Sequence, residues 1–224
     1  MYLNTNFEAH LSALLFLGAA VSLLILVVTT LGFWLWKKQW VRYPLWTMVL
    51  LLAGYGVLLL GFSLLSRERT LALGQEKYFC ELDCHLAYSV QKAERVKQIG
   101  DTAAKGEFYV VTVRNRFDES TTAPWRPRDA ALTPDPLNLA IVDTDGVGIF
   151  PSEAGQRAWD ALHGVSKTFF DPILPGESAE ATFVFDVPPA AHSPRLLVSI
   201  SGFPTPVLIG DENSLLHKKT YFSL

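Results

Sequence analysis

The first third of the chain contains few charged residues. No Asp, Glu, Lys or Arg occurs from Leu11 to Trp36 or from Leu45 to Leu65, although 18% of the 224 residues are charged and the mean hydropathy is +0.23. An uncharged apolar stretch of about 20 residues is long enough to cross the hydrocarbon core of a bilayer. The sequence therefore predicts two transmembrane helices, about 11–36 and 45–65, within a helical hairpin of residues 1–66.

The tail before the first apolar stretch lacks Lys and Arg, which argues against a cleaved secretory signal. Such a signal has a positively charged start, an apolar core of about 7–15 residues and a cleavage site with small residues. Here the apolar run is longer, and it ends in the bulky sequence Phe33-Trp34-Leu35-Trp36. We therefore expect an uncleaved membrane anchor.

Aromatic residues crowd the short connection between the two apolar stretches. They are Trp34, Trp36, Trp40, Tyr43 and Trp46. Tryptophan and tyrosine rings settle at the headgroup level of a membrane, where one part of the ring is apolar and the other is wet. The sequence therefore predicts that these residues anchor the hairpin at a membrane interface.

The orientation of the hairpin depends on the basic residues near the spans. The connection carries Lys37, Lys38 and Arg42, whereas the N-terminal tail carries none. Cytoplasmic loops are enriched in Lys and Arg, although Arg67, Arg69 and Lys77 follow the second span. We expect a protein of the bacterial inner membrane, with both termini and the remaining domain on the periplasmic side.

The part of the chain outside the hairpin has an excess of acid. Lys37, Lys38, Arg42 and Glu8 belong to the hairpin; subtracting them from the totals of 19 basic and 22 acidic residues leaves 16 and 21, a formal charge of −5. Such a surface repels phosphate backbones. Nucleic acid is therefore excluded as the expected partner.

Turn signals separate short β-type segments after a linker at 67–75. Glu107–Asn115 is rich in β-branched and aromatic residues, as expected for a strand, and Asp145-Gly146 between two apolar runs predicts a hairpin. Thr121–Pro136 contains four prolines and is expected to be a loop. Ser152–Leu162 begins with a good N-cap and is followed by Gly164, which predicts one short helix. Further strands are expected at 76–90, 137–142, 147–150, 179–187, 195–201, 207–209 and 220–224.

Frequent turns, about seven short strands and little helix predict a two-layer antiparallel β-sandwich over residues 76–224. Within it, Val-Thr-Val-Arg-Asn at 111–115, Leu-Pro-Gly-Glu-Ser at 174–178 and Ala-Thr-Phe-Val-Phe-Asp-Val-Pro at 181–188 precede Leu-Leu-Val-Ser-Ile at 196–200. This domain resembles the bacterial immunoglobulin-like domains of unknown function that are held outside the membrane by a lipid or helical anchor. The resemblance implies an immunoglobulin-like fold and no particular activity.

The chain has only two cysteines, Cys80 and Cys84, and His85 follows the second. A disulfide is the default on an oxidising face, but it needs Cα atoms within about 7 Å. Residues four apart in a straight strand are about 13 Å apart, so a disulfide requires this segment to turn. There are two alternatives. The two cysteines could bind a single copper or zinc ion together with His85 and His217, or they could form a redox-active thiol pair.

Two apolar spans followed by a β domain with Cys-x-x-x-Cys also resemble subunit II of haem-copper oxidases. That resemblance implies a dinuclear copper site, yet this sequence departs from the family pattern. His85 is adjacent to the second cysteine rather than four residues later, and the only methionines are Met1 and Met48. The motif also opens the domain instead of lying late in it.

We find no nucleophile with an adjacent base, and Gly146-Val147-Gly148 lacks the third glycine of a dinucleotide loop. The hypothesis from sequence is therefore a non-catalytic accessory subunit that stabilises a larger membrane complex, such as a bacterial photosynthetic or respiratory energy-converting complex. Its expected partners are membrane protein subunits and lipid, and no cofactor is expected. The alternative is a copper- or zinc-binding or redox domain centred on Cys80, Cys84 and His85.

Overall fold

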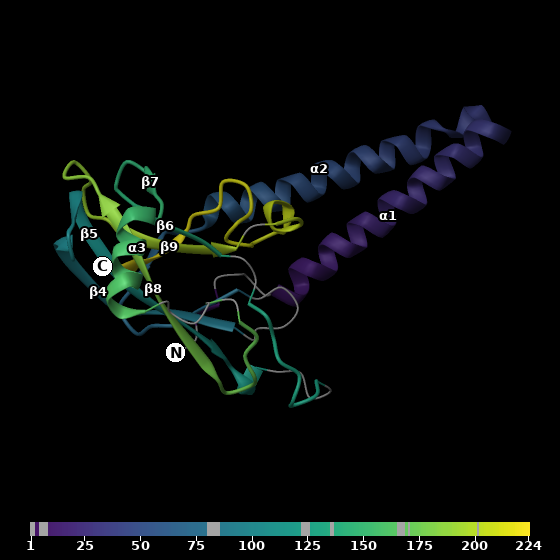
Figure 1. Cartoon of the computed structure of the whole chain (residues 1–224). Helices are drawn as coiled ribbons and strands as arrows, with labels where there is room; N and C mark the ends of the chain where they lie inside the picture. The colour runs from purple at the N-terminus through teal and green to yellow at the C-terminus, as the bar shows by residue number, and fades with distance from the viewer. Residues whose placement is uncertain are drawn as a thin grey trace. The chain divides into compact units, whose positions relative to one another are not determined.

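The computed structural model describes residues 3–4, 9–79, 86–121, 126–134, 137–164, 169, 171–200 and 202–224 (Figure 1). These residues form two compact units. The β unit takes its residues from 1–5, 68–201 and 219–224, and the hairpin unit takes its residues from 6–67 and 202–218.

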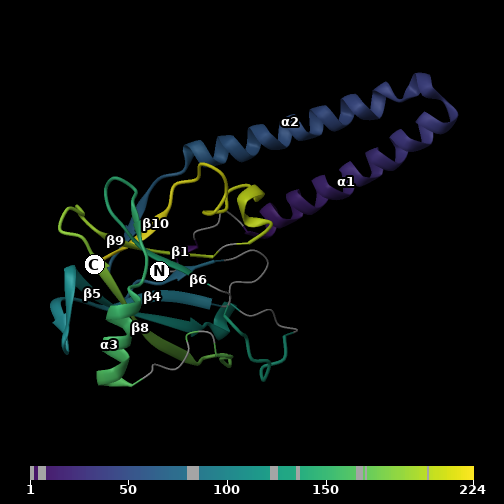
Figure 2. The same ribbon diagram turned by 45° about the horizontal axis from the view of Figure 1, so that its top comes forward.

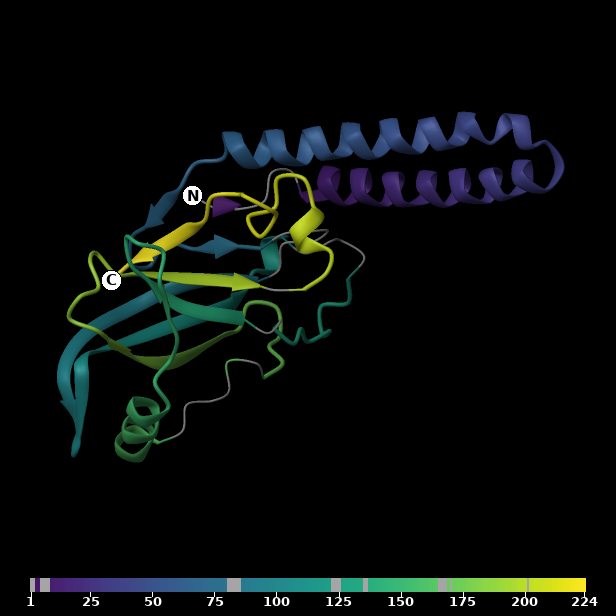
Figure 3. The same cartoon turned by 90° about the horizontal axis from the view of Figure 1, so that it is seen from above.

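The hairpin unit contains the two apolar helices that the sequence predicts. Helix α1 (Ala9–Trp36) is followed by a short 3-10 turn at Lys38–Trp40 and by α2 (Arg42–Leu65), and the helices run side by side in opposite directions (Figure 3). Both are long and apolar enough to cross a membrane. Helix α2 begins three residues before the predicted span because Pro44 fits the first turn of a helix, where its missing N–H is not needed.

Segment 202–218 belongs to the hairpin unit, which corrects the strand expected at 207–209. A 3-10 turn occupies Thr205–Val207, and Leu208 and Ile209 are buried. The apolar run of this segment therefore reflects burial in an irregular segment and not strand pairing. Pro204 and Pro206 lack the N–H groups that a paired strand would require.

The β unit consists of two five-stranded sheets (Figure 2). Sheet A contains, in spatial order, β1 (Leu3–Asn4), β3 (Lys77–Tyr78), β4 (Leu86–Ile99), β5 (Thr102–Phe117) and β8 (Ser178–Val187). Sheet B contains β2 (Arg69–Leu71), β10 (Thr220–Ser223), β9 (Arg195–Ile200), β6 (Leu137–Val142) and β7 (Gly148–Ile149). Alternate residues of both sheets share one core, which includes Val111 and Val113 from sheet A and Leu196 and Val198 from sheet B.

Two edge pairs depart from the expected all-antiparallel arrangement. Strand β1 pairs with β3, and β2 pairs with β10, both in parallel. The predicted linker at 67–75 thus contains a strand, β2. Because β2 and β10 are far apart in sequence, no turn signal between them could indicate this pairing.

The local turn and helix signals of the sequence are confirmed. Strands β6 and β7 pair antiparallel, and the turn between them places Gly146 at φ +79°, a conformation that glycine adopts without strain. Helix α3 (Glu153–His163) begins after Ser152, whose Oγ accepts a hydrogen bond from the N–H of Gly155. It packs on Phe108 and Val184 of sheet A, and Figure 2 shows the helix beside this sheet.

Candidate functional site

The hairpin exposes large apolar side chains along both helices. Leu24 is 65% exposed, Leu50 is 69% exposed and Val57 is 71% exposed. The hydroxyl groups of Thr29 and Thr30 donate to carbonyls four residues earlier, at 2.8 and 2.6 Å, so these polar groups need no water. A contiguous apolar surface of this kind suits lipid or other apolar helices.

The predicted interfacial residues lie at the turn end of the hairpin (Figure 3). Trp34, Trp36, Trp40, Tyr43 and Trp46 are all at least 46% exposed. The rings of Trp40 and Tyr43 lie 5.5 Å apart between centroids. The hairpin thus ends in a collection of exposed amphipathic rings beside the basic residues of the turn.

The β unit has a groove of about 800 Å³ that is lined by residues of both sheets. Arg95, Lys97 and Tyr109 line it from sheet A, and Arg195 lines it from sheet B. The volume lies within the range typical of small-molecule sites, about 300–1,000 Å³. Glu107 is an acidic side chain in the same lining.

Two arginines of this groove are held by aromatic rings. Arg95 lies directly opposite Tyr109 in the β4–β5 pairing, and its guanidinium carbon lies 5.4 Å from the centroid of that ring. The guanidinium of Arg195 lies 4.2 Å from the centroid of Tyr221 and pairs with Glu68, while its Nε is buried without a hydrogen-bond partner. Arg195 already binds Glu68, whereas stacking on Tyr109 leaves the N–H edge of Arg95 available. Arg95 and Lys97 are therefore the cations of the groove that can bind a carboxylate or another oxyanion.

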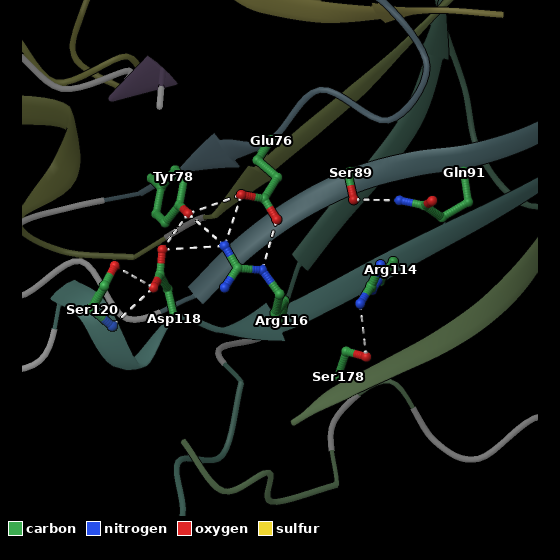
Figure 4. A network of polar contacts seen from close by, with 9 residues as sticks. All are labelled: Glu76, Tyr78, Ser89, Gln91, Arg114, Arg116, Asp118, Ser120 and Ser178. Carbon is green, nitrogen blue, oxygen red and sulfur yellow. Dashed lines mark hydrogen bonds and ion pairs between the residues drawn. The ribbon is translucent and has the colours of Figure 1, made fainter. Parts of the chain in front are cut away.

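A polar network lies on the opposite face of sheet A from the core (Figure 4). Tyr78, Ala87 and Arg116 are directly opposite one another across β3, β4 and β5, and the small side chain of Ala87 lets the other two meet. Arg116 donates two hydrogen bonds of 2.8 Å to Glu76 and one of 3.0 Å to the Tyr78 hydroxyl. The Tyr78 hydroxyl donates to Asp118 at 2.7 Å.

The electrostatics of this network favour its charged carboxylates. Burial by itself raises the pKa of Asp118, but hydrogen bonds from Ser120, Tyr78 and Arg116 outweigh it and lower the pKa to about 2. The bond from Arg116 lowers the pKa of Glu76. Burial, followed by hydrogen bonding to Asp118, raises the pKa of Tyr78, so this tyrosine stays protonated and the network joins β3 to β5.

The predicted metal or disulfide residues are not brought together by the described part of the chain. Cys80, Cys84 and His85 lie outside the described residues, between Tyr78 and Ala87, which pair antiparallel. His217 lies in the hairpin unit, with its Nδ1 2.7 Å from the carbonyl oxygen of Lys218. Among the described residues, no group of three or more His, Cys, Asp or Glu side chains could hold a metal ion. The disulfide, the metal site and the redox-active thiol pair therefore stay predictions.

The sequence does not reveal that a charged side chain of the β unit is buried between the two sheets. The sequence places Lys77 among the basic residues that follow the second span, but in the structure it is fully buried and its Nζ donates to carbonyl oxygens of sheet B. The available signal was a charged residue beside Tyr78 and Phe79 in a β-type segment. That signal could not identify acceptors that lie more than a hundred residues further along the chain.

Comparisons with known proteins give only distant likenesses. No protein-family model matches the chain, and no curated protein matches it. Among solved structures, the secreted protein MPT63 of Mycobacterium tuberculosis is 14% identical, with 70% of this chain and 98% of that chain covered and a TM-score of 0.42. The yjhA protein of Bacillus subtilis is 10% identical over 68% and 98% of the two chains, with a TM-score of 0.41. A conserved hypothetical protein from Bacillus anthracis is 12% identical over 57% and 87%, also with a TM-score of 0.41. None of the three is described as a haem-copper oxidase subunit, and likenesses at these scores carry no inference about function.

Proposed function

We propose that this chain is a membrane-anchored accessory subunit whose two helices span the bacterial inner membrane and carry an immunoglobulin-like domain on the periplasmic side. The observation that carries the proposal is the hairpin surface, which is apolar and exposed over two helices of spanning length. In water this surface would drive aggregation. Lipid and the apolar helices of a larger membrane complex, photosynthetic or respiratory, are the partners that such a surface fits.

The dimensions and the chemistry of the helices support a full span. Helices α1 and α2 contain 28 and 24 residues, or roughly 42 and 36 Å at about 1.5 Å per residue, against a hydrocarbon core of about 30 Å. The charged residues between Ala9 and Leu65 are Lys37, Lys38 and Arg42, all in or beside the turn. A cytoplasmic turn agrees with the enrichment of basic residues on that side.

Reporter fusions test the topology. Alkaline phosphatase fused after Leu224 is expected to be active, because the enzyme folds only outside the cytoplasm, and a fluorescent protein that matures only in the cytoplasm should stay dark at the same position. Fusions of both reporters after Gln39, in the turn, serve as the matched control and are expected to give the opposite pattern. Phosphatase activity in the turn but not after Leu224 would overturn the proposed orientation.

A second experiment tests the accessory role. Gly54 and Gly61 lie about one face of α2, and a Cβ atom added at either would meet nothing within 4 Å. Gly54→Leu and Gly61→Leu are therefore expected to leave the hairpin intact while blocking the close approach of a partner helix. In a mild-detergent extract of the native membrane, co-isolated subunits should fall by about tenfold, a loss of roughly 1.4 kcal/mol in association.

Leu52→Phe is the matched control for this experiment. Leu52 is 56% exposed and lies on the opposite side of α2 from Gly54. It should leave co-isolation unchanged. Migration of the unmodified protein as a lone chain would contradict the accessory role without affecting the topology.

The groove of the β unit offers a polar surface to the same complex. Two cations of its lining, Arg95 and Lys97, fit an acidic segment of a periplasmic partner. The proposal thus assigns apolar contacts to the hairpin and polar contacts to the groove.

A further inference from the structure

The segment from Gly202 to Lys218 lies beside the two helices of the hairpin (Figure 3) and forms hydrogen bonds with both. The Tyr55 hydroxyl donates to the carbonyl oxygen of Val207 at 2.7 Å, and the Ser12 hydroxyl donates to that of Ile209. The hydroxyls of Ser63 and Ser214 lie 3.3 Å apart. The N–H of Lys218 donates to Ser66 Oγ at 2.8 Å. These contacts extend from Tyr55 to Ser66, roughly 16 Å of helix at about 1.5 Å per residue.

Polar side chains in the middle of the segment are buried. Asp211 is 2% exposed, Glu212 1% and Ser214 3%, and they lie in the same unit as the buried Ser63. Local hydrogen bonds satisfy some of these buried groups. The N–H of Asn213 donates to Asp211 Oδ1 at 2.6 Å, and the Ser214 hydroxyl donates to the Asp211 carbonyl at 2.7 Å. Loops in water normally show the reverse arrangement.

Large apolar side chains of the segment point outward. Phe203 is 84% exposed, Leu215 is 59% exposed and Leu216 is 61% exposed. The ring of Phe203 meets the ring of Phe16 in α1 edge to face, with 5.8 Å between centroids, so the exposed surface of the segment continues that of the helix. Leu216 has φ +63°, a conformation that is costly for leucine and is usually kept only where it serves a function.

We propose that segment 202–218 is a lipid-facing collar that inserts into the outer leaflet beside the hairpin. This inference rests on the proposed membrane span. If the hydrocarbon core begins near Tyr43, about 20 residues carry α2 across it, to the level of Ser63. Tyr55 then lies roughly 12 Å inside the outer boundary, at about 1.5 Å per residue. The collar reaches from the headgroups into the acyl chains, and the Tyr55 hydroxyl satisfies a backbone carbonyl where water is absent.

Photo-crosslinking in native membranes tests the collar with the full-length chain. The photoreactive residue p-benzoylphenylalanine replaces Phe203, Leu215 or Leu216, one position at a time, and adducts of phospholipid are measured by mass. Lys218, exposed and next to Ser66, is the control at the aqueous end. We expect lipid adducts at the three apolar positions to exceed those at Lys218 by about tenfold, because apolar side chains of interfacial segments bury themselves at the acyl boundary.

The same probe at Leu24 and Leu50 separates this inference from the membrane span. Lipid adducts at Leu24 and Leu50 without adducts at Phe203, Leu215 and Leu216 would overturn the collar and leave the span intact. Lipid adducts at none of the five positions would overturn both. Adducts of a protein at the collar positions would show that a partner subunit, and not lipid, covers this segment, and would also overturn the collar.

Discussion

Lys77→Met is expected to lower the free energy of unfolding of the β unit by about 2–4 kcal/mol, because it removes two charge-assisted hydrogen bonds from a buried site. Lys77 is fully buried. Its Nζ donates to the carbonyl oxygens of Val198 at 2.7 Å and Thr220 at 3.0 Å, and lies 4.8 Å from the centroid of Phe79. Methionine retains most of the side-chain volume but provides no donor, so these carbonyls lose the cation that joins sheet A to sheet B.

The measurement is urea unfolding of the full-length protein in detergent, followed by hydrogen exchange in peptides of β4, β5 and β8. Lys92→Met makes the same chemical change on the surface, where the side chain is 63% exposed and lies 2.7 Å from Glu94. It should change stability by less than about 0.5 kcal/mol. Equal stabilities of Lys77→Met and the parent would show that the desolvation of the buried ammonium cancels the benefit of its hydrogen bonds.

Asp118→Asn is expected to cost about 2 kcal/mol at pH 7 and to remove part of the acid sensitivity of the β unit. The Asp118 side chain is 3% exposed, and its pKa is lowered from 3.8 to about 2. A depressed pKa contributes stability that is complete above the unfolded value and is lost as the pH falls through the folded value. At about 1.4 kcal/mol per pKa unit, the contribution disappears between about pH 5 and pH 2.

The decisive measurement is the stability difference between parent and variant at pH 7, 5, 4 and 3. It should narrow as the pH falls, because protonation of Asp118 in the parent removes the same interactions. Asp101→Asn, in the exposed β4–β5 turn, should remain within about 0.5 kcal/mol of the parent at every pH. If Asp118→Asn does not fold, Tyr78→Phe removes the donor to Asp118 and should shift the acid transition to higher pH. A constant difference across the whole range would contradict the assigned role of Asp118.

Short-range signals in the sequence predict the two apolar helices, helix α3 and the turn between β6 and β7. The residues from Leu11 to Trp36 carry no charge, and only a helix satisfies every backbone group within such a stretch. Ser152 begins α3 because its side-chain oxygen accepts a hydrogen bond from the first turn, and Gly164 ends it because glycine adopts a positive φ without strain. The Asp-Gly turn between β6 and β7 follows from the positive φ of Gly146.

Burial of charge and the edges of the sheets could not be predicted in this way. Lys77 is buried because β9 and β10 supply acceptors for its ammonium group, and Arg116 meets Tyr78 only because Ala87 separates them in the sheet register. The parallel pairing of β2 with β10 joins opposite ends of the β unit in sequence. Each of these contacts depends on how strands that are distant in sequence align with one another. A local sequence pattern carries no information on that alignment.

The sequence by itself determined that the chain has two apolar helices of spanning length and a β-rich remainder, because hydropathy, capping and turn chemistry act over a few neighbouring residues. Only the tertiary structure decided that segment 202–218 packs with the helices, that Lys77 lies inside the core, and that Arg95 and Arg195 line one groove. The physical reason is that these arrangements depend on which distant groups satisfy a buried donor or cover an apolar face. Such pairings are settled when the whole chain packs.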